Sequence, residues 1–346
     1  MEGSFSIESI VTDVRTRGDA AVAQWSTHFD ATTSDRPERA VPGAGLPTQA
    51  ILDAADAVRR WHEVQRPRDV TLEVFPGVVL ERHWVPLRAI GVYVPRNLVS
   101  SLVMGAVPAQ VAGCERIVVC TPPSGAPLVA AAAELLGIDE VWAVGGVQAI
   151  AAMAYGTELI GRVDKIVGPG SGPVNAAKLL VSRDVAIDLP AGPSDVVVVA
   201  DDGVEEWIIA QELAAQMEHG PDSKGYVVRV GDDIEQALER VEEHAGEHVF
   251  LIGERAESLA PRIRNAGAVF VGRFSPVPSG DYATGANHVL PTDGWARSTG
   301  GLGLESFMKP VTIQRLTKQG LDRIAPTIEA LADVEGMLNH KATARR

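Results

Sequence analysis

The chain has 346 residues, of which 46% are hydrophobic and 22% charged, and its net charge is −14 at pH 7. This length predicts two or more α/β units, and the negative charge argues against nucleic acid or an anionic membrane surface as a partner, since both require a basic face. The two cysteines, Cys114 and Cys120, cannot build a disulfide framework or a cysteine-based zinc site, so we expect a reducing, cytoplasmic environment.

The N-terminal part is predicted to be helical and then to form paired strands. Its first residues are acidic and lack an apolar segment, which is not the pattern of a secretory signal. Helical periodicity covers residues 6–30 and 47–66, and the alternation in "VTLEVFPGVVLERHWVPL" predicts two strands that pair. We expect residues 1–87 to pack as a helical and strand segment on an α/β body.

Short β-branched runs and helical stretches alternate from Arg88 onward. A first round runs from "RIVVCTP" to "PVNAAKLLVS" and a second from "DVVVVAD" to "AVFVG", the latter including the helical stretch "ESLAPRIRNAG". Strands separated by single helices imply right-handed crossovers and parallel sheets. The predicted fold class is α/β with two Rossmann-like parallel-sheet halves, at 88–190 and 191–291. Residues 292–346 are expected to be Gly-rich and then to form a helical C-terminal arm, and no run reads as a membrane span.

Four polar residues are candidates for a metal site. Gln216 and His219 in "QMEHGPDS" lie three residues apart at the end of a predicted helix, on the same side, directly before a Gly-Pro break. Asp281 in "SGDY" and His340 in "LNHK" add a carboxylate and a second imidazole. An amide oxygen, a carboxylate oxygen and two imidazoles suit zinc or a similar divalent ion. The alternative is that each residue is a hydrogen-bonded loop or helix-end residue.

Further polar residues are expected beyond the carboxyl ends of the parallel strands, where such sheets bind ligands. Ser194 lies in a Gly-Pro loop before a strand, His288 among turn residues, and Glu335 near the C-terminus. Glu247 and His248 stand side by side at a strand entrance, where one could activate water and the other accept a proton. Against this, neighbours on a strand face opposite sides.

No G-x-G-x-x-G follows a predicted strand, so the fold pattern alone does not indicate a nicotinamide cofactor. The stretch "GPGSGP" before a helix could hold an anion on backbone N–H groups, or it could be a plain strand-to-helix turn.

Several long blocks resemble those of the histidinol dehydrogenase family: "QMEHGPDS", "DLPAGPSDVVVVAD", "VGGVQAIAAMAYGTE", "VDKIVGPG", "RIRNAGAVFVG" and "GDYATGANHVLPT". The resemblance extends from "VRTRGDAAV" to "LNHKA". It implies a homodimeric, zinc-dependent enzyme that oxidises L-histidinol through the aldehyde to L-histidine with two NAD molecules, in histidine biosynthesis.

The resemblance also implies roles for individual residues. The family's zinc ligands match Gln216, His219, Asp281 and His340. Its acid–base pair matches Glu247 and His248, and its substrate-contacting positions match Ser194, His288 and Glu335. Its cofactor positions match Tyr93 in "GVYVP", Gln148 in "GGVQAI" and Ser171 in "GPGS".

These matches imply a division of labour at the site. His248 would accept the proton of the alcohol as hydride leaves, and Glu247 would activate the water that converts the aldehyde to the acid. Zinc in this family anchors the imidazole and amine of the substrate. Glu335 and His340 belong to a tail that completes the site of the partner subunit, so a homodimer with exchanged arms is expected.

The chain departs from the family pattern at three places. Ser171 replaces an asparagine, and Arg96 and Asn97 replace a Gly-Gly pair in a shortened loop. Arg96 could grip a cofactor phosphate, could reshape the cofactor site, or could be harmless drift. A stretch between "GYVVRVG" and "AGEHVFL" is missing, which affects the pocket wall. A dehydrogenase for another amino alcohol or polar diol is therefore an alternative function, and a non-catalytic zinc- and ligand-binding homologue is another.

Overall fold

The computed structural model describes residues 5–189 and 192–345, which form two compact units. Unit 1 comprises residues up to Gln65 and Leu87–Phe307, and unit 2 comprises Arg66–Pro86 and the chain from Met308 onward. The predicted segment 1–87 is thus divided between the units. The predicted boundary between the two halves, at residues 190 and 191, lies outside the described residues.

The first sheet of unit 1 is parallel, with strand order β5-β4-β3-β6-β7. Its strands are β3 (Ala89–Tyr93), β4 (Arg116–Cys120), β5 (Val141–Trp142), β6 (Lys165–Val167) and β7 (Ala186–Ile187). The chain runs outward from β3 through β4 and β5 and then returns to β6 on the other side. This reversal of strand order between β3 and β6 is where sheets of this kind leave a crevice for a ligand.

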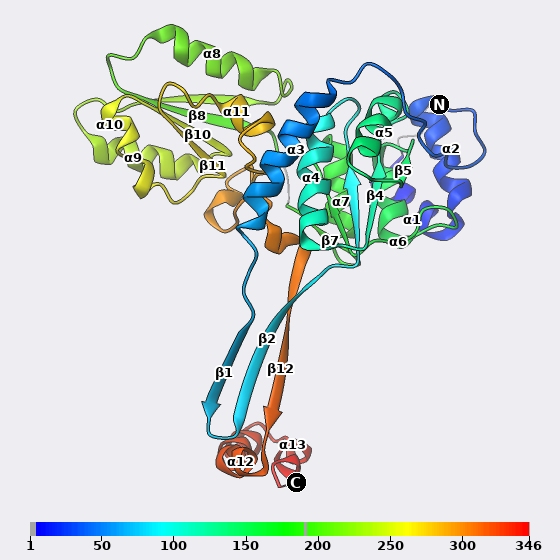
Figure 1. The fold of residues 1–346 in the computed structure, drawn as a ribbon, viewed down its shortest axis with the longest axis vertical. Helices are drawn as coiled ribbons and strands as arrows, with labels where there is room; N and C mark the ends of the chain where they lie inside the picture. The colour runs from blue at the N-terminus through cyan, green and yellow to red at the C-terminus, as the bar shows by residue number, and fades with distance from the viewer. Residues whose placement is uncertain (1–4, 190–191, 346) are drawn as a thin grey trace. The chain divides into compact units, whose positions relative to one another are not determined.

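Helices cover the first sheet on both faces (Figure 1). The helices are α1 (Ile7–Arg17), α2 (Asp19–Asp30), α3 (Thr48–Glu63), α4 (Val99–Ala112), α5 (Ala126–Leu135), α6 (Gly146–Tyr155) and α7 (Gly172–Val181). Apolar residues of α1, α2, α6 and α7 share one core with the sheet, while α4 packs against β3, α3 and α5. The continuous apolar strands are those of a sheet buried on both faces, as the sequence predicts.

The second sheet of unit 1 is also parallel, with strand order β11-β10-β8-β9. Its strands are β8 (Asp195–Ala200), β9 (Lys224–Arg229), β10 (His248–Ile252) and β11 (Ala268–Val271), and its helices are α8 (Glu206–Met217), α9 (Ile234–His244), α10 (Glu254–Glu257) and α11 (Val277–Tyr282). One face packs on α9 and α10, and the other packs on α8 and α11. The two parallel sheets confirm the predicted α/β fold class.

Two local predictions were incomplete. The stretch "ESLAPRIRNAG" was expected to be one helix, but α10 ends at Glu257 and only a 3-10 turn, η1 (Ala260–Arg262), follows. Pro261 lies in this stretch, and proline interrupts a helix interior because it has no N–H. In the glycine-rich stretch after Thr292, two further 3-10 turns form, η2 (Trp295–Arg297) and η3 (Leu304–Phe307).

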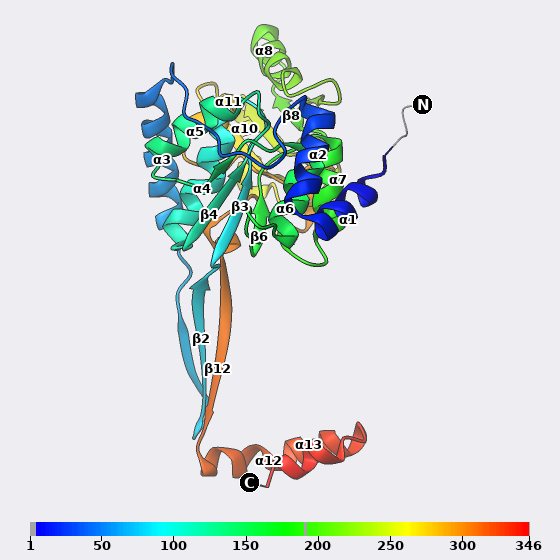
Figure 2. The ribbon, with the colours of Figure 1, turned by 90° about the vertical axis from the view of Figure 1, so that its right-hand side faces the viewer.

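Unit 2 is an antiparallel three-stranded sheet followed by two helices. The strands are β1 (Val70–Phe75), β2 (Val78–Pro86) and β12 (Met308–Leu316), in the order β1-β2-β12, and the helices are α12 (Lys318–Val334) and α13 (Leu338–Thr343). Figure 2 shows β2 and β12 side by side, with α12 and α13 beyond them. The predicted C-terminal helices are present, but β12 was not predicted. Within the described residues, no helix is long and apolar enough to cross a lipid bilayer.

Candidate active site

Glu247 and His248 lie at the amino end of β10, and both are buried. The Glu247 carboxylate accepts a hydrogen bond from the Ser194 hydroxyl at 2.5 Å and a longer one from the Asp195 backbone N–H at 3.3 Å. The His248 Nδ1 atom lies 3.7 Å from the same carboxylate oxygen. Although they are neighbours in the sequence, the two side chains therefore share one site.

Asp195 fixes the orientation of both residues. Its carboxylate accepts the Glu247 backbone N–H at 2.9 Å, and its backbone carbonyl lies 3.1 Å from His248 Nδ1. A carbonyl only accepts, so this contact assigns the imidazole proton to Nδ1 and leaves a lone pair on Nε2. His248 is therefore oriented to accept a proton at Nε2. The sequence analysis did not select Asp195, although it directly follows Ser194.

Burial shifts the protonation of this pair in opposite directions. It raises the pKa of the Glu247 carboxyl to about 8, with further increases from the negative charges of Asp195 and Asp281, while the Ser194 hydrogen bond lowers it. Burial also lowers the pKa of His248 to about 4, although the negative charge of Asp281 acts to raise it. Near neutral pH, His248 is thus an uncharged imidazole and Glu247 titrates in the range that suits a general base.

Gln216 connects this pair to the predicted metal ligands. Its side-chain N–H donates to the Ser194 hydroxyl oxygen at 2.7 Å, so that the hydroxyl proton is directed to Glu247. The other side-chain atom, Oε1, is buried and has no hydrogen-bond partner among the described residues. A buried, unpaired amide oxygen is costly, and it is an atom that can ligate a divalent cation.

His219 and Asp281 lie in the same neighbourhood. The charges of both affect the pKa of His248, as does the charge of His288. His288 Nδ1 contacts the Asp281 backbone carbonyl at 3.0 Å, and its Nε2 is buried without a partner in the described part of the chain. Gln216 and His219 also flank the carboxyl-terminal end of α8, where the helix dipole favours a cation.

This donor set fits zinc on two observations, the orphaned Gln216 oxygen and the match of amide, imidazole and carboxylate to that ion. Within residues 5–189 and 192–345, however, no three His, Cys, Asp or Glu side chains are grouped so that they could hold a metal. Of the four expected ligands, Gln216, His219 and Asp281 belong to unit 1. His340, in α13, and Glu335, directly after α12, are exposed residues of unit 2.

The site lies at the amino edge of the second sheet, and the expectation of a carboxyl-edge site was wrong for Ser194, Glu247 and His248. In a βαβ unit each helix returns antiparallel to its strand, so the carboxyl ends of helices lie beside the amino ends of strands. The end of α8, which carries Gln216, therefore leads toward the start of β9.

The predicted cofactor residues lie at the carboxyl edge of the first sheet. Tyr93 ends β3, Gln148 is in the first turn of α6 after β5, and Ser171 precedes α7 after β6. The Tyr93 hydroxyl accepts the Gly146 N–H at 3.1 Å. Both polar side-chain atoms of Gln148 are buried with no partner in the described residues. The amide therefore offers one donor group and one acceptor group to a ligand that binds at this edge.

The loops at this edge are tightly packed. Gly168, after β6, has φ +113°, and a Cβ there would lie 2.2 Å from the Tyr93 carbonyl oxygen, so only glycine fits. The buried ion pair of Lys178 and Asp188 holds the backbone of Gly168. The Gly168 N–H donates to the Asp188 carboxylate at 2.7 Å, and the Gly168 carbonyl accepts from Lys178 Nζ at 2.8 Å. Arg96, in the loop after β3, has φ +30°. It thus adopts a backbone conformation in which the family's glycine would be unstrained.

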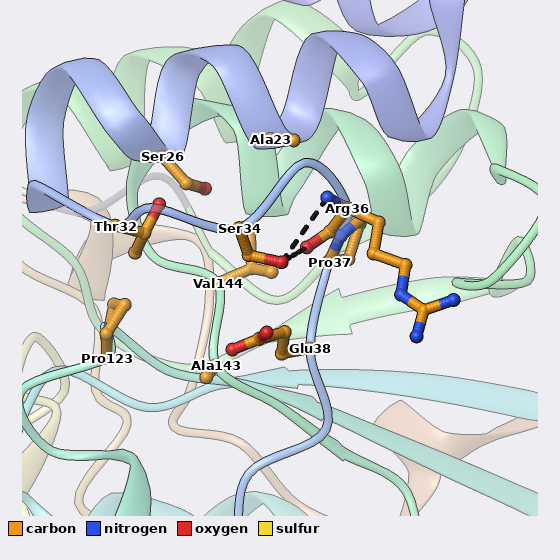
Figure 3. A pocket seen from close by; sticks show the side chains of 10 residues that line it. All are labelled: Ala23, Ser26, Thr32, Ser34, Arg36, Pro37, Glu38, Pro123, Ala143 and Val144. Atoms are coloured by element: carbon orange, nitrogen blue, oxygen red, sulfur yellow. Dashed lines mark hydrogen bonds between the residues drawn. The ribbon is translucent and has the colours of Figure 1, made fainter.

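A small pocket of about 50 Å³ lies near the ends of β4 and β5. Figure 3 shows the hydroxyl groups of Ser26 and Thr32 near one another in it, with Glu38 opposite and Arg36 directed away. The Ser26 hydroxyl is buried and has no partner within the described residues. The pocket contains none of the residues selected from the sequence and has room for a few water molecules.

Comparisons with known proteins agree on one family. A family model described as histidinol dehydrogenase matches residues 3–231 and 223–346. The histidinol dehydrogenase of Methanosarcina barkeri is 37% identical over 393 aligned positions, covering 98% of this chain and 90% of that protein. That of Vibrio parahaemolyticus is 37% identical over 386 positions, covering 97% and 90%.

A solved structure is similar over the whole chain. The crystal structure of histidinol dehydrogenase from Elizabethkingia anophelis has a TM-score of 0.91 at 33% identity and covers 99% of this chain and 92% of that one. The sequence alignments are longer than the chain itself, so the relatives carry segments that it lacks. The family match divides at residues 223–231, on and just beyond β9.

Proposed function

The chain belongs to the histidinol dehydrogenase family of oxidoreductases, and from that premise we propose that it oxidises L-histidinol through the aldehyde to L-histidine, with zinc and NAD. The observation that carries this proposal is the relay Gln216–Ser194–Glu247 beside a neutral His248. It joins a prospective metal ligand, a hydroxyl and two acid–base groups in one buried site.

In the alcohol step, His248 accepts the proton of the substrate hydroxyl at Nε2 as hydride leaves the carbon. Asp195 holds the imidazole in the required orientation. In the aldehyde step, Glu247 takes a proton from water so that the oxygen can add to the carbonyl carbon, and a second hydride then leaves. Both residues are buried, which excludes bulk water from competing with these transfers.

Zinc would be held by Gln216, His219, Asp281 and His340, and it would supply a positive charge that binds and orients the substrate. Ser194, His288 and Glu335 would contact the substrate. NAD would accept the hydride from a position defined by Tyr93, Gln148 and Ser171. The free thiols of Cys114 and Cys120 suit the cytoplasm, which we propose as the location.

A homodimer in which arms are exchanged would complete the metal shell, because only three of the four proposed ligands, Gln216, His219 and Asp281, belong to unit 1. Unit 2 carries many exposed large hydrophobic side chains, among them Val70, Leu72, Leu331, Val334 and Leu338. Exposed apolar surface of this extent is typical of an interface. We propose that it packs against the second copy of the chain.

The experiment is oxidation of histidinol with NAD or NADP by wild-type protein and by Glu247→Gln. Wild type should form histidine with NAD and lose activity with a chelator. In Glu247→Gln the aldehyde-to-acid step should slow by roughly 10²-fold or more, and the alcohol step should be affected much less. Background rates with both cofactors would contradict the proposal, and equal losses in both steps would contradict the role of Glu247.

A dehydrogenase for a different amino alcohol or polar diol is the second candidate. The division of the family match on and just beyond β9 favours it, because the stretch expected to be missing lies between β9 and β10, which begins at His248. Relative kcat/KM values for histidinol and a panel of amino alcohols decide between the two. A panel member that exceeds histidinol by tenfold or more would favour the alternative.

A further inference from the structure

Glu212 is a buried carboxylate with no role in the proposed chemistry. It lies in α8 with 8% of its surface exposed, among the apolar residues that join this helix to the second sheet. A carboxylate in such a layer is costly unless it forms a specific hydrogen bond. A hydrogen bond to this carboxylate comes from another helix: the backbone N–H of Val277 donates to Glu212 Oε2 at 3.1 Å.

This contact joins the two helices that carry predicted metal ligands. Glu212 lies one turn before Gln216 in α8, and Val277 lies four residues before Asp281 in α11, so each partner is on the same helical face as a ligand. The Glu212–Val277 hydrogen bond thus lies one helical turn before the prospective ligands Gln216 and Asp281 in each helix.

The α11 helix depends on such a tie. It has only six residues, its N-cap is Pro276, and no side chain of its own segment caps it. So short a helix is not stable by itself, and the Glu212 carboxylate pairs the first of its free N–H groups from across the boundary. At its other end, a Cβ on Gly280 would lie 2.7 Å from the Phe270 ring, so α11 sits close to β11.

We propose that Glu212 is a positioning residue for the metal site, which holds α11 against α8 so that Asp281 and Gln216 converge on one cation. The inference rests on the proposed zinc-dependent function. Its physical basis is that a ligand carried by a short helix is only as well placed as the helix itself, and residues that support ligands change metal affinity by roughly 10- to 100-fold.

The test measures zinc retention by the full-length protein in competition with a chelator, together with thermal unfolding. Glu212→Leu removes the acceptor while matching its apolar neighbours Ile208 and Ile209, and Glu212→Ala is a second variant without an acceptor. Both should weaken zinc binding by roughly tenfold or more. Glu212→Gln keeps an oxygen acceptor and should bind zinc within about threefold of wild type.

The matched control is Asp233→Ala, which removes the cap of α9 and its two hydrogen bonds. This cap follows the carboxyl end of β9, whereas Gln216 and His219 lie toward the amino edge of the sheet. It should lower thermal stability with no change in zinc affinity. If Glu212→Leu and Glu212→Ala bind zinc as tightly as wild type, the role assigned to Glu212 is overturned, but the proposed metal site is not. The same follows if Asp233→Ala loses as much zinc affinity as the Glu212 variants. A wild-type protein that retains no zinc would overturn the proposed metal site and this assignment together.

Discussion

At the residue scale, Glu247 combines a costly buried position with its proposed role as a base. Between about pH 4.5 and pH 8 its carboxyl ionises in the unfolded chain but keeps its proton in the folded one. The folded state then binds more protons, so stability falls as pH rises through this window. The carboxylate that we propose as the base thus destabilises the protein in which it is buried.

The corresponding prediction concerns metal-free protein. In the presence of a chelator, Glu247→Gln should be more stable than wild type, with little difference at pH 4.5. The difference should grow to a few kcal/mol at pH 8, at about 1.4 kcal/mol per unit of pKa shift. Urea unfolding of both proteins at several pH values measures this. A difference that is the same at every pH would show that the carboxyl does not titrate in this range.

Arg96 is a second residue with a conformational cost. It has a left-handed φ of +30°. Burial raises the pKa of the nearby Asp30 carboxyl, and the charge of Arg96 opposes this increase. A non-glycine residue in this region is strained by about 1–2 kcal/mol, and such strain is found at ligand-binding positions. These observations favour a functional role for the arginine over harmless drift.

We therefore predict two opposite effects of Arg96→Gly. Stability should rise by about 0.5–1 kcal/mol, because glycine removes the strain at some cost in chain entropy. NAD binding, measured by calorimetry, should weaken several-fold as a cation near the cofactor is lost. The neighbouring Asn97→Gly serves as control and should give neither effect. Unchanged NAD affinity in Arg96→Gly would identify the arginine as drift.

At the element scale, the loop between β6 and α7 depends on the buried Lys178–Asp188 pair, which holds both polar groups of the Gly168 peptide. Lys178→Met should destabilise the protein by about 3–5 kcal/mol, because it leaves a buried charge unpaired. The double variant Lys178→Met with Asp188→Leu should regain most of this stability.

NAD affinity should not be regained in the double variant, since the Gly168 peptide then lacks both partners. Urea unfolding and calorimetric titration with NAD measure the two quantities separately. If the double variant binds NAD as tightly as wild type, the ion pair serves stability only.

Most elements of unit 1 were predictable because buried parallel strands and amphipathic helices have distinct hydrophobic periods. β12 was not, since its residues are almost all exposed and include Pro310, so no alternation of burial marks it. Site convergence could not be derived either, because spacing does not place Gln216 near Ser194 or Glu247. These residues were candidates from the sequence pattern, the family resemblance assigned them to one site, and the structure added Asp195 and Glu212.

At the scale of the whole molecule, the proposed exchange of arms makes a prediction about mixed dimers. Glu247→Gln should form histidine at roughly a hundredth of the wild-type rate or less, and His340→Ala should be inactive with reduced zinc retention. A heterodimer contains one protomer of each variant. If the arms are exchanged, unit 1 of the His340→Ala protomer, which has an intact Glu247, receives the intact His340 of its partner. Randomly reassociated protomers should then regain about a quarter of wild-type activity. No recovery would mean that each arm completes its own site.

The two native thiols offer a practical route to the arm. Cys120 is fully enclosed, and burial raises the pKa of the half-buried Cys114 to about 12, so neither reacts readily with alkylating reagents. One engineered surface cysteine in each unit would therefore take up a spin label selectively, with neither native cysteine removed. Pulsed dipolar spectroscopy would then measure the distance between the label on unit 1 and the label on unit 2, with and without substrate.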